Sequence, residues 1–392
     1  MREVPPLYAR EDIIRLFDKF NGSKFSAKNR FLRSATWLAS ADDNGFLTSD
    51  GVGRLVELAA GGVGTVVTGF AYVSPEGKAL PRQLGIDRNE CVGGIAAAAD
   101  GAHRFGSKLI VQIVHAGGQK KGETSPGLPI YSPSGLTHTG EKDSSIALDE
   151  GGIMKVRRDF SAAALRAKKA GADGVEIHAG HGFLITQFLS PVINKRGDNY
   201  GGSIENRMRL LREIYSDMRA AVGVDFPVWL KLSMAEGTPD GYTADEGLEV
   251  AKTLLSDGAD GLEVSYGATY AGAQHSPSVI GVSAGESEAP FEKYAVELKK
   301  IFDGRKLIIL TGGLRSLDFM AGLIKRNSCD LLGISRPLIA EPDLINRWAE
   351  EDSRPSACLS CNACFKTSAV GAVGCPIIID RNEGNWDPID EC

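Results

Sequence analysis

Residues 176–202 read EIHAGHGFLITQFLSPVINKRGDNYGG and follow directly on the apolar residues Gly174 and Val175. A short apolar run of this kind is typical of a buried strand, and the pattern after it predicts a loop and then a helix. His178 and His181 are therefore expected at the C-terminal end of a strand. Two imidazole N–H donors at a fixed spacing suit the binding of an oxygen that gains negative charge during a reaction. The alternative is an unrelated pair of surface or core histidines, and the position at a strand end favours the first interpretation.

The same strand pattern recurs along the chain. The predicted strands span residues 31–36, 63–69, 108–115, 173–180, 227–233, 260–267, 306–313 and 330–336. Several are continuously apolar, as strands of a parallel sheet covered by helices on both faces are. Amphipathic stretches that predict helices lie between them, at 160–170, 204–222, 244–257, 290–302 and 316–325.

Eight strand–helix units in series predict an α/β protein with the (β/α)8 TIM-barrel fold. The alternative is a doubly wound sheet, which would carry a glycine-rich G-x-G-x-x-G loop after its first strand. Residues 31–36 are followed by Trp37-Leu-Ala-Ser instead. We expect the barrel to occupy residues 1–350 and a short cysteine-rich C-terminal extension to occupy residues 351–392. The irregular segment 117–152, after the third strand, is expected to form a lid or one wall of a pocket.

Composition excludes several classes of partner. The chain has 392 residues and a formal net charge of −6, without a dense block of Lys and Arg that would indicate a nucleic-acid surface. The N-terminal segment is charged where a signal peptide has its apolar core, and the apolar runs are too short to span a membrane. We therefore expect a cytoplasmic protein with a small-molecule substrate, no nucleic acid and no membrane. Assembly into a homo-oligomer is left open.

Glycines and polar residues at the last two strand ends predict a phosphate site. The seventh strand ends with Gly312 and Gly313, and the eighth ends with Ser335 and Arg336. Loops after these two strands form the common phosphate site of such barrels, because glycine lets backbone N–H groups approach phosphate oxygens and arginine adds two donors. This pair of motifs favours a cofactor with a phosphate group.

Two polar residues inside predicted strands also need partners. Gln112 lies in the third strand, where a buried amide requires hydrogen bonds that a flat heterocycle would supply. Lys231 lies in the fifth strand, where a buried ammonium is costly unless it faces an anion. The negative N1/C2 edge of a reduced flavin would be such an anion. The alternative for Lys231 is a lysine at the strand end that reaches water.

The run HAGHGFLITQFLSPVINKRGDNYGGSIENR, at 178–207, resembles the motif of the Old Yellow Enzyme family of FMN-dependent NADH:flavin oxidoreductases. Further matches are NRFLRSAT at 29–36, QIVHAGGQ at 112–119 and YSPS at 131–134. Together with the two phosphate loops, these matches cover about residues 25–345 in the order of the family.

The resemblance implies a role for each of several residues. Those implied to contact FMN are Ser34, Ala35, Thr36, Gly69 with Phe70, Gln112, Lys231, Gly312, Gly313, Ser335 and Arg336. His178 and His181 are implied to bind the oxygen of a carbonyl or nitro group. Hydride would pass from the flavin to the β carbon of the conjugated C=C bond, and NADH or NADPH would reduce the flavin in a separate half-reaction.

Two residues in the predicted substrate pocket depart from the family pattern. The family usually carries a tyrosine as proton donor two residues after the second histidine, where this chain has Phe183, which has no exchangeable proton. Tyr131, Tyr266, Tyr270 or solvent could replace it, or the reaction could be a dehydrogenation that needs no acid. Trp37 stands where the family often has a small polar residue.

The C-terminal extension has a cysteine motif of its own. Cys358, Cys361, Cys364 and Cys375 have the spacing C-x2-C-x2-C-x10-C, which suits zinc or an iron–sulfur cluster. This motif resembles that of the 2,4-dienoyl-CoA reductase and trimethylamine dehydrogenase branch, although those proteins usually have three residues before the third cysteine and carry a further domain that exchanges electrons with the cluster. We expect the chain to lack room for that domain. The cysteines are thus metal ligands or reduced thiols.

Three functions remain on this basis. The first is an FMN-dependent ene-reductase that uses NAD(P)H to reduce the activated C=C bond of α,β-unsaturated carbonyl compounds. The second, favoured by Phe183 and the cysteines, is an FMN-dependent amine dehydrogenase or demethylase. The third is a barrel that binds a phosphorylated ligand without catalysis.

Overall fold

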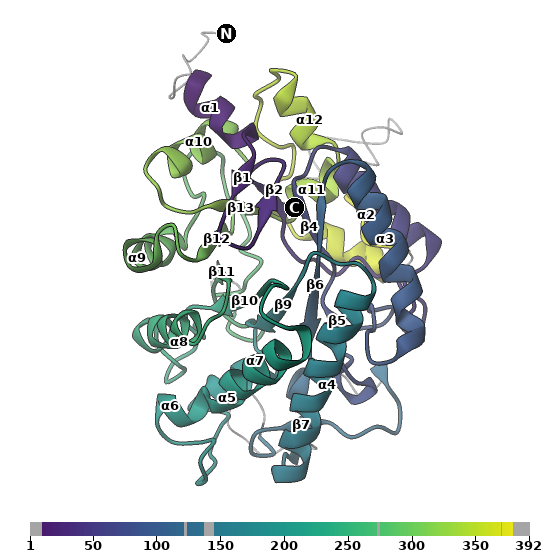
Figure 1. Cartoon of the computed structure of the whole chain (residues 1–392), viewed down its shortest axis with the longest axis vertical. Helices are drawn as coiled ribbons and strands as arrows, with labels where there is room; N and C mark the ends of the chain where they lie inside the picture. Colours follow the sequence, from purple (N-terminus) through teal and green to yellow (C-terminus); the bar gives the residue numbers. More distant parts are fainter. Residues whose placement is uncertain (1–9, 121–123, 137–144, 273–274, 370, 379–392) are drawn as a thin grey trace.

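The computed structural model describes residues 10–120, 124–136, 145–272, 275–369 and 371–378. A barrel of parallel strands forms its centre (Figure 1). The barrel strands are β3 (Phe31–Arg33), β4 (Thr65–Val67), β6 (Lys108–Val114), β9 (Gly174–Ala179), β10 (Val228–Ser233), β11 (Gly261–Ser265), β12 (Leu307–Thr311) and β13 (Leu331–Ile334). Because β4 pairs with both β3 and β6, the sheet closes on itself. The predicted (β/α)8 barrel and its eight strands are confirmed.

Helices cover the outside of the barrel (Figure 1). The longer ones are α2 (Ser49–Ala60), α3 (Val92–Arg104), α4 (Glu150–Lys169), α7 (Arg209–Val222), α8 (Ala244–Ser256), α9 (Glu292–Phe302) and α10 (Leu317–Lys325). The shorter ones are α1 (Arg10–Phe17), α5 (Leu184–Leu189), α6 (Ile204–Arg207), α11 (Pro337–Ala340) and α12 (Leu344–Ala349). The helix predicted at 204–222 is divided at Met208, and α4 begins ten residues before the predicted helix at 160–170.

Local sequence explains where these elements begin and what they bury. A capping box of Thr243 and Glu246 satisfies backbone N–H groups at the start of α8. One face of α7 carries Leu210, Ile214 and Met218 into the core, because these residues recur at the helical period. None of the helices in the described ranges combines the length and apolar character that a membrane-crossing segment needs.

Several short strands accompany the barrel. A hairpin of β1 (Phe20–Asn21) and β2 (Ser26–Ala27) precedes β3, and β5 (Ala71–Tyr72) extends the sheet beside β6. Within the segment 117–152, predicted to be irregular, β7 (Tyr131–Ser132) pairs with β8 (Ile146–Ala147), and residues 121–123 and 137–144 lie outside the described residues.

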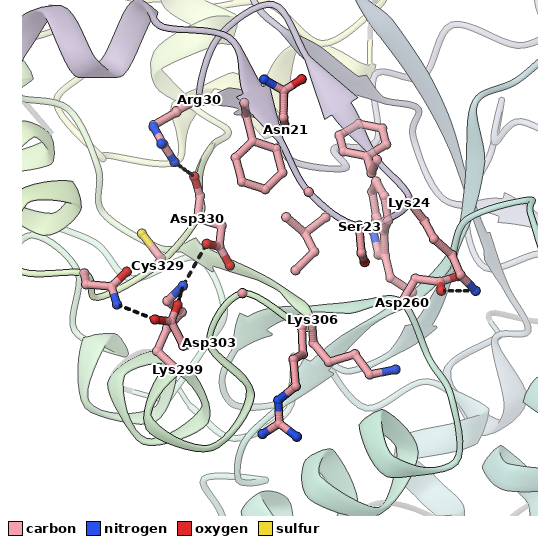
Figure 2. Close-up of a pocket in the computed structure, with 18 of the residues that line it drawn as sticks. Asn21, Ser23, Lys24, Arg30, Asp260, Lys299, Asp303, Lys306, Cys329 and Asp330 are labelled. Carbon is pink, nitrogen blue, oxygen red and sulfur yellow. Dashed lines mark hydrogen bonds and ion pairs between the residues drawn. The ribbon is translucent and has the colours of Figure 1, made fainter.

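A cavity of about 440 Å³ lies at the N-terminal ends of the strands, beneath the β1–β2 hairpin. Figure 2 shows two pairs of opposite charge in it: Lys299 Nζ lies 2.8 Å from Asp330 Oδ1, and Lys24 Nζ lies 3.1 Å from Asp260 Oδ1. Asp330 also accepts the backbone N–H of Ile308, which ties two neighbouring strands together. In barrel enzymes this end serves stability, and the paired charges here fit that role.

Candidate active site at the C-terminal ends of the barrel strands

A second cavity, of about 400 Å³, lies among the residues at the C-terminal ends of the strands, where barrel enzymes carry their active sites. The predicted site residues that line it are Ser34, Ala35, Thr36, Trp37, Gln112, His178, His181, Phe183, Lys231, Gly312 and Ser335. The predicted residues Gly69, Gly313 and Arg336 are not among its lining residues. Most of the predicted site is therefore gathered in one cavity.

The two histidines lie side by side at the end of β9, with their ring centroids 4.9 Å apart. His178 is in register with Lys231 of β10, so both side chains come from the same level of the barrel. His181 follows in a turn with φ of +63°, an uncommon conformation for a residue with a side chain. Ser233 Oγ accepts its backbone N–H at 3.0 Å, and its Nε2 lies 2.7 Å from Ser265 Oγ. These contacts hold the ring in place.

Both imidazoles are neutral at ordinary pH. Burial, and then the charge of Lys231, lowers the pKa of His178 to about 3. Burial, and then His178 and Lys231, lowers the pKa of His181 well below its ordinary value. A neutral imidazole carries one N–H, so the pair offers hydrogen bonds to a substrate oxygen rather than a full positive charge.

An aromatic wall adjoins the histidines. The Phe183 ring lies 5.0 Å from the His178 ring and 5.5 Å from that of Phe70. Of the tyrosines considered as proton donors, Tyr270 donates its hydroxyl hydrogen to Glu236 at 2.9 Å, and Tyr266 stacks on Phe291. Among the described residues, no tyrosine lines the cavity.

Beneath the cavity is a buried polar layer, formed by Ser34, Gln112, Glu176, Trp229, Lys231 and Glu263. Lys231 is 4% exposed, and its Nζ lies 2.7 Å from Glu263 Oε1 and donates to Ser34 Oγ at 2.6 Å. The alternative of a lysine that reaches water is therefore wrong, and the anion that faces Lys231 is supplied by the protein. Gln112 Nε2 donates to Glu176 Oε1 at 2.6 Å. A carboxyl group of the protein therefore supplies one of the hydrogen bonds for which a heterocycle was expected.

Sequence reasoning missed both glutamates of the buried polar layer. Each interrupts an otherwise apolar strand, as in GVEIHA of β9 and GLEVS of β11. Strand register explains their contacts, because Glu176 is level with Gln112 on one side and Trp229 on the other, while Glu263 is level with Lys231. An acidic residue in a fully buried strand was the available signal.

The predicted phosphate end is only partly assembled around the cavity. Gly312 has φ of +123°, and an added Cβ would lie 2.9 Å from the Phe291 ring, so a side chain is excluded there. Ser335 Oγ lies 2.6 Å from Thr36 Oγ1. Arg336 instead donates to Asn362 Oδ1 at 2.7 Å, in the cysteine-rich extension. The role of Arg336 in phosphate binding stays a prediction.

The extension packs on this end of the barrel. Arg315, which sequence reasoning missed, donates to the carbonyl oxygen of Cys358 at 2.8 Å, and Val373 N–H bonds to the carbonyl oxygen of Leu38 at 2.9 Å. Phe365 lines the cavity, and Trp37 packs against the extension while its indole N–H donates to Pro81 O at 3.2 Å. The extension therefore contributes to one wall of the site, and the division into 1–350 and 351–392 stays a prediction.

Cys358, Cys361, Cys364 and Cys375, the described cysteines of the extension, form no disulfide in this structure. Within the described part of the chain, no group of three or more His, Cys, Asp or Glu side chains is arranged to hold a metal ion. Burial, and then the neighbouring cysteines, raises the pKa of Cys364 to about 11. Metal binding by Cys358, Cys361, Cys364 and Cys375 stays a prediction. Anaerobic purification with iron, sulfide and zinc assays tests it, and metal at trace level would favour the interpretation as reduced thiols.

The fold and the cavity define a class of protein: a (β/α)8 barrel with a candidate active site at the C-terminal ends of its strands, where two histidines lie close to a lysine and a glutamine. The chain belongs to the NADH:flavin oxidoreductase / NADH oxidase family, whose model matches residues 15–354. Members of this family are NAD(P)H:flavin oxidoreductases, so the family predicted from the sequence is confirmed.

Similar proteins include an NADH oxidase of Thermoanaerobacter brockii, 32% identical over 88% of this chain and 52% of the relative. An NADPH dehydrogenase of Halalkalibacterium halodurans is 32% identical over 84% of this chain and 92% of the relative. Among solved structures, a 2-naphthoyl-CoA reductase complex is 25% identical with a TM-score of 0.84, over 96% of this chain and 58% of that chain. Histamine dehydrogenase from Rhizobium sp. 4-9 is 25% identical with a TM-score of 0.79, over 93% of this chain and 52% of that chain. The chain thus spans about half the length of several proteins that it resembles.

The residues present fit FMN, the cofactor that the family implies. Gln112 and Lys231 offer polar groups on one side of the cavity, and Gly312 with Ser335 lie at the predicted phosphate end. His178 Nδ1 is buried without a hydrogen-bond partner among the described residues, which a bound oxygen acceptor would supply. Gln112, Lys231, Gly312 and Ser335 would hold the cofactor, and His178 would remain available to the substrate oxygen.

The buried histidines predict acid sensitivity. Burial lowers the pKa of His115 to about 4, as it lowers that of His178 to about 3. Between pH 6.5 and 4 the unfolded chain binds protons that the folded chain does not, so the free energy of unfolding falls as the pH falls, by about 3 kcal/mol for each histidine. Urea unfolding between pH 7 and 4.5 measures this slope. Glu176, whose pKa burial raises, acts in the opposite sense, so the test compares wild type with His115→Gln, in which we expect a shallower slope. Equal slopes would contradict the assignment.

Proposed function

We propose that this protein is an FMN-dependent ene-reductase, which uses NADH or NADPH to reduce the activated C=C bond of α,β-unsaturated carbonyl-type substrates. The observation that carries the proposal is the neutral pair of His178 and His181, held side by side against the cavity. FMN, when bound, supplies the two-electron transfer between NAD(P)H and the substrate.

The residues of the chain prepare the substrate. N–H groups of the histidine pair donate to the carbonyl oxygen, which draws electron density from the conjugated bond and makes its β carbon electrophilic. Ser265 and Ser233 keep His181 in position, because they contact its ring and its backbone. Phe70 and Phe183 form an apolar wall that excludes water and strengthens these hydrogen bonds.

A second candidate is FMN-dependent oxidation of an amine, as in an amine dehydrogenase or demethylase. Trp37, Phe70 and Phe183 place aromatic rings on the cavity, and aromatic faces attract organic cations. The similarity to histamine dehydrogenase, and the absence of an acid at Phe183, favour the same function. Noncatalytic binding of a phosphorylated ligand would leave the histidine pair without a function.

Absorbance and stopped-flow measurements separate these functions. The ene-reductase predicts a yellow protein whose NAD(P)H-reduced flavin is reoxidised anaerobically by an enone such as cyclohexenone. The amine dehydrogenase predicts that an amine bleaches the oxidised flavin and that enones leave the reduced flavin unchanged. A colourless protein that takes up no FMN would refute both functions.

A further inference from the structure

Glu263 lies directly behind the cation of the candidate flavin site. It is fully buried on β11. Its Oε1 atom lies 2.7 Å from Lys231 Nζ and accepts hydrogen bonds from Ser34 Oγ at 2.6 Å and from Thr311 Oγ1 at 2.7 Å. Lys231, Ser34 and Thr311 all line the cavity, whereas Glu263 does not. The carboxyl group therefore touches three cavity residues from behind.

The residues around Glu263 favour its ionised form. Burial alone would raise the pKa of Glu263, but the charge of Lys231 and the hydrogen bonds from its neighbours lower the pKa below the ordinary value. Glu176 is equally buried, yet burial and the charge of Glu263 raise its pKa well above the ordinary value. The pKa shifts of the two buried glutamates thus have opposite directions, and the shift of Glu263 favours the carboxylate form beside Lys231.

The ionised carboxylate changes what the cavity presents to a ligand. Among the described residues that line the cavity, Lys231 is the cation, and the buried Arg33 guanidinium lies within electrostatic range of Glu263. Without Glu263, both positive charges would raise the electrostatic potential in the cavity. The carboxylate of Glu263 offsets one of them. A flavin gains negative charge when it is reduced, so a carboxylate behind Lys231 opposes that gain, and opposition between buried charges is strong.

We propose that Glu263 is a positioning residue that orients Lys231 toward the cavity and offsets its charge, and thereby keeps the reduction potential of bound FMN low. A low potential favours transfer of electrons onward to the substrate. This inference rests on the proposed binding of FMN, and it concerns a residue that does not itself line the cavity.

The test compares two isosteric substitutions in the FMN-loaded protein. Sulfite donates its lone pair to form a reversible S–N bond with oxidised flavin, and the flavin ring of the product carries a negative charge. Because nearby positive charge stabilises that product, the Kd of sulfite reports the positive charge around the ring. Glu263→Gln removes a charge, and we expect the Kd of sulfite to fall by about tenfold or more and the reduction potential to rise. Glu176→Gln changes a carboxyl group whose raised pKa favours the neutral form, and we expect the Kd to change by less than about threefold.

The outcomes separate this inference from the proposed function. Wild-type protein that holds no FMN would refute the proposed function, whereas FMN-loaded Glu263→Gln with an unchanged sulfite Kd and potential would refute the role of Glu263 alone. An equal effect of both substitutions would also refute it, because a structural disturbance would act at either glutamate. If Glu263→Gln does not fold, Lys231→Gln is compared at pH 8.5 with Lys231→Gln/Glu263→Gln, so that the two variants differ only in the charge of Glu263. The double variant should bind sulfite more tightly, and equal Kd values would count against the proposal.

Discussion

Replacing His178 by phenylalanine is expected to lower kcat/KM for an enone by about a hundredfold or more. The substitution keeps a planar ring in the buried position but removes the N–H that polarises the substrate, and the loss of one such donor costs roughly 10² to 10³ in rate. The effect should be large here because the ring is 2% exposed and water cannot replace the donor. Anaerobic stopped-flow mixing of the reduced enzyme with cyclohexenone measures the rate directly.

His178→Asn is the matched control, because asparagine keeps an N–H donor at the same position. We expect it to retain activity within about tenfold of wild type, with the FMN content of both variants unchanged. Retained activity in His178→Phe would show that the histidine pair does not bind the substrate oxygen, and the ene-reductase proposal would then lose its main support.

The barrel was predictable because its strands have a distinctive composition. Runs such as LIIL in β12 are apolar without alternation, which is typical of a sheet buried on both faces, and the amphipathic helices between them indicate parallel connections. The helix boundaries were harder to predict. The helix predicted at 204–222 is divided at Met208, a buried core residue, and the helical period alone does not reveal that break.

The site was predictable where a residue follows directly from a strand end. His178, His181, Gln112 and Lys231 all line the cavity, since strand register places them at one end of the barrel. Arg336 was harder to predict, because its guanidinium donates a hydrogen bond to Asn362, in an extension with no helical or strand period. Contacts between segments distant in sequence depend on tertiary packing. The hydrogen bond from Arg315 to the carbonyl oxygen of Cys358 is a second such contact.

The ion pair of Lys231 with Glu263 shows a third limit of prediction from the sequence. Elementary electrostatics correctly required an anion near a buried lysine. It did not say whether the anion belongs to a ligand or to the protein, and Glu263 stands 32 residues further along the chain, on the neighbouring strand. An acidic residue in a strand that is otherwise apolar is visible in the amino-acid sequence, so a search for such residues would identify Glu263 as a candidate partner.

Replacing Phe183 by tyrosine is expected to raise the rate of enone reduction by about tenfold, if proton delivery limits that step. The ring lines the cavity, contacts His178 and is 8% exposed, so an added hydroxyl would place an acid at a site that now has none. General acids typically contribute 10² to 10⁴ in rate, and solvent that already delivers protons accounts for the smaller gain expected here. Single-turnover reduction of cyclohexenone at saturating NADH or NADPH measures it.

Phe70→Tyr provides the control for this gain, because Phe70 lies beside Phe183 on the same wall and the substitution adds the same hydroxyl elsewhere. We expect no increase in that variant, and a solvent isotope effect that changes only in Phe183→Tyr. An unchanged rate in Phe183→Tyr would mean that protonation is not limiting. A protein that oxidises amines would respond differently again, since its reaction releases a proton and gains nothing from an acid at this position.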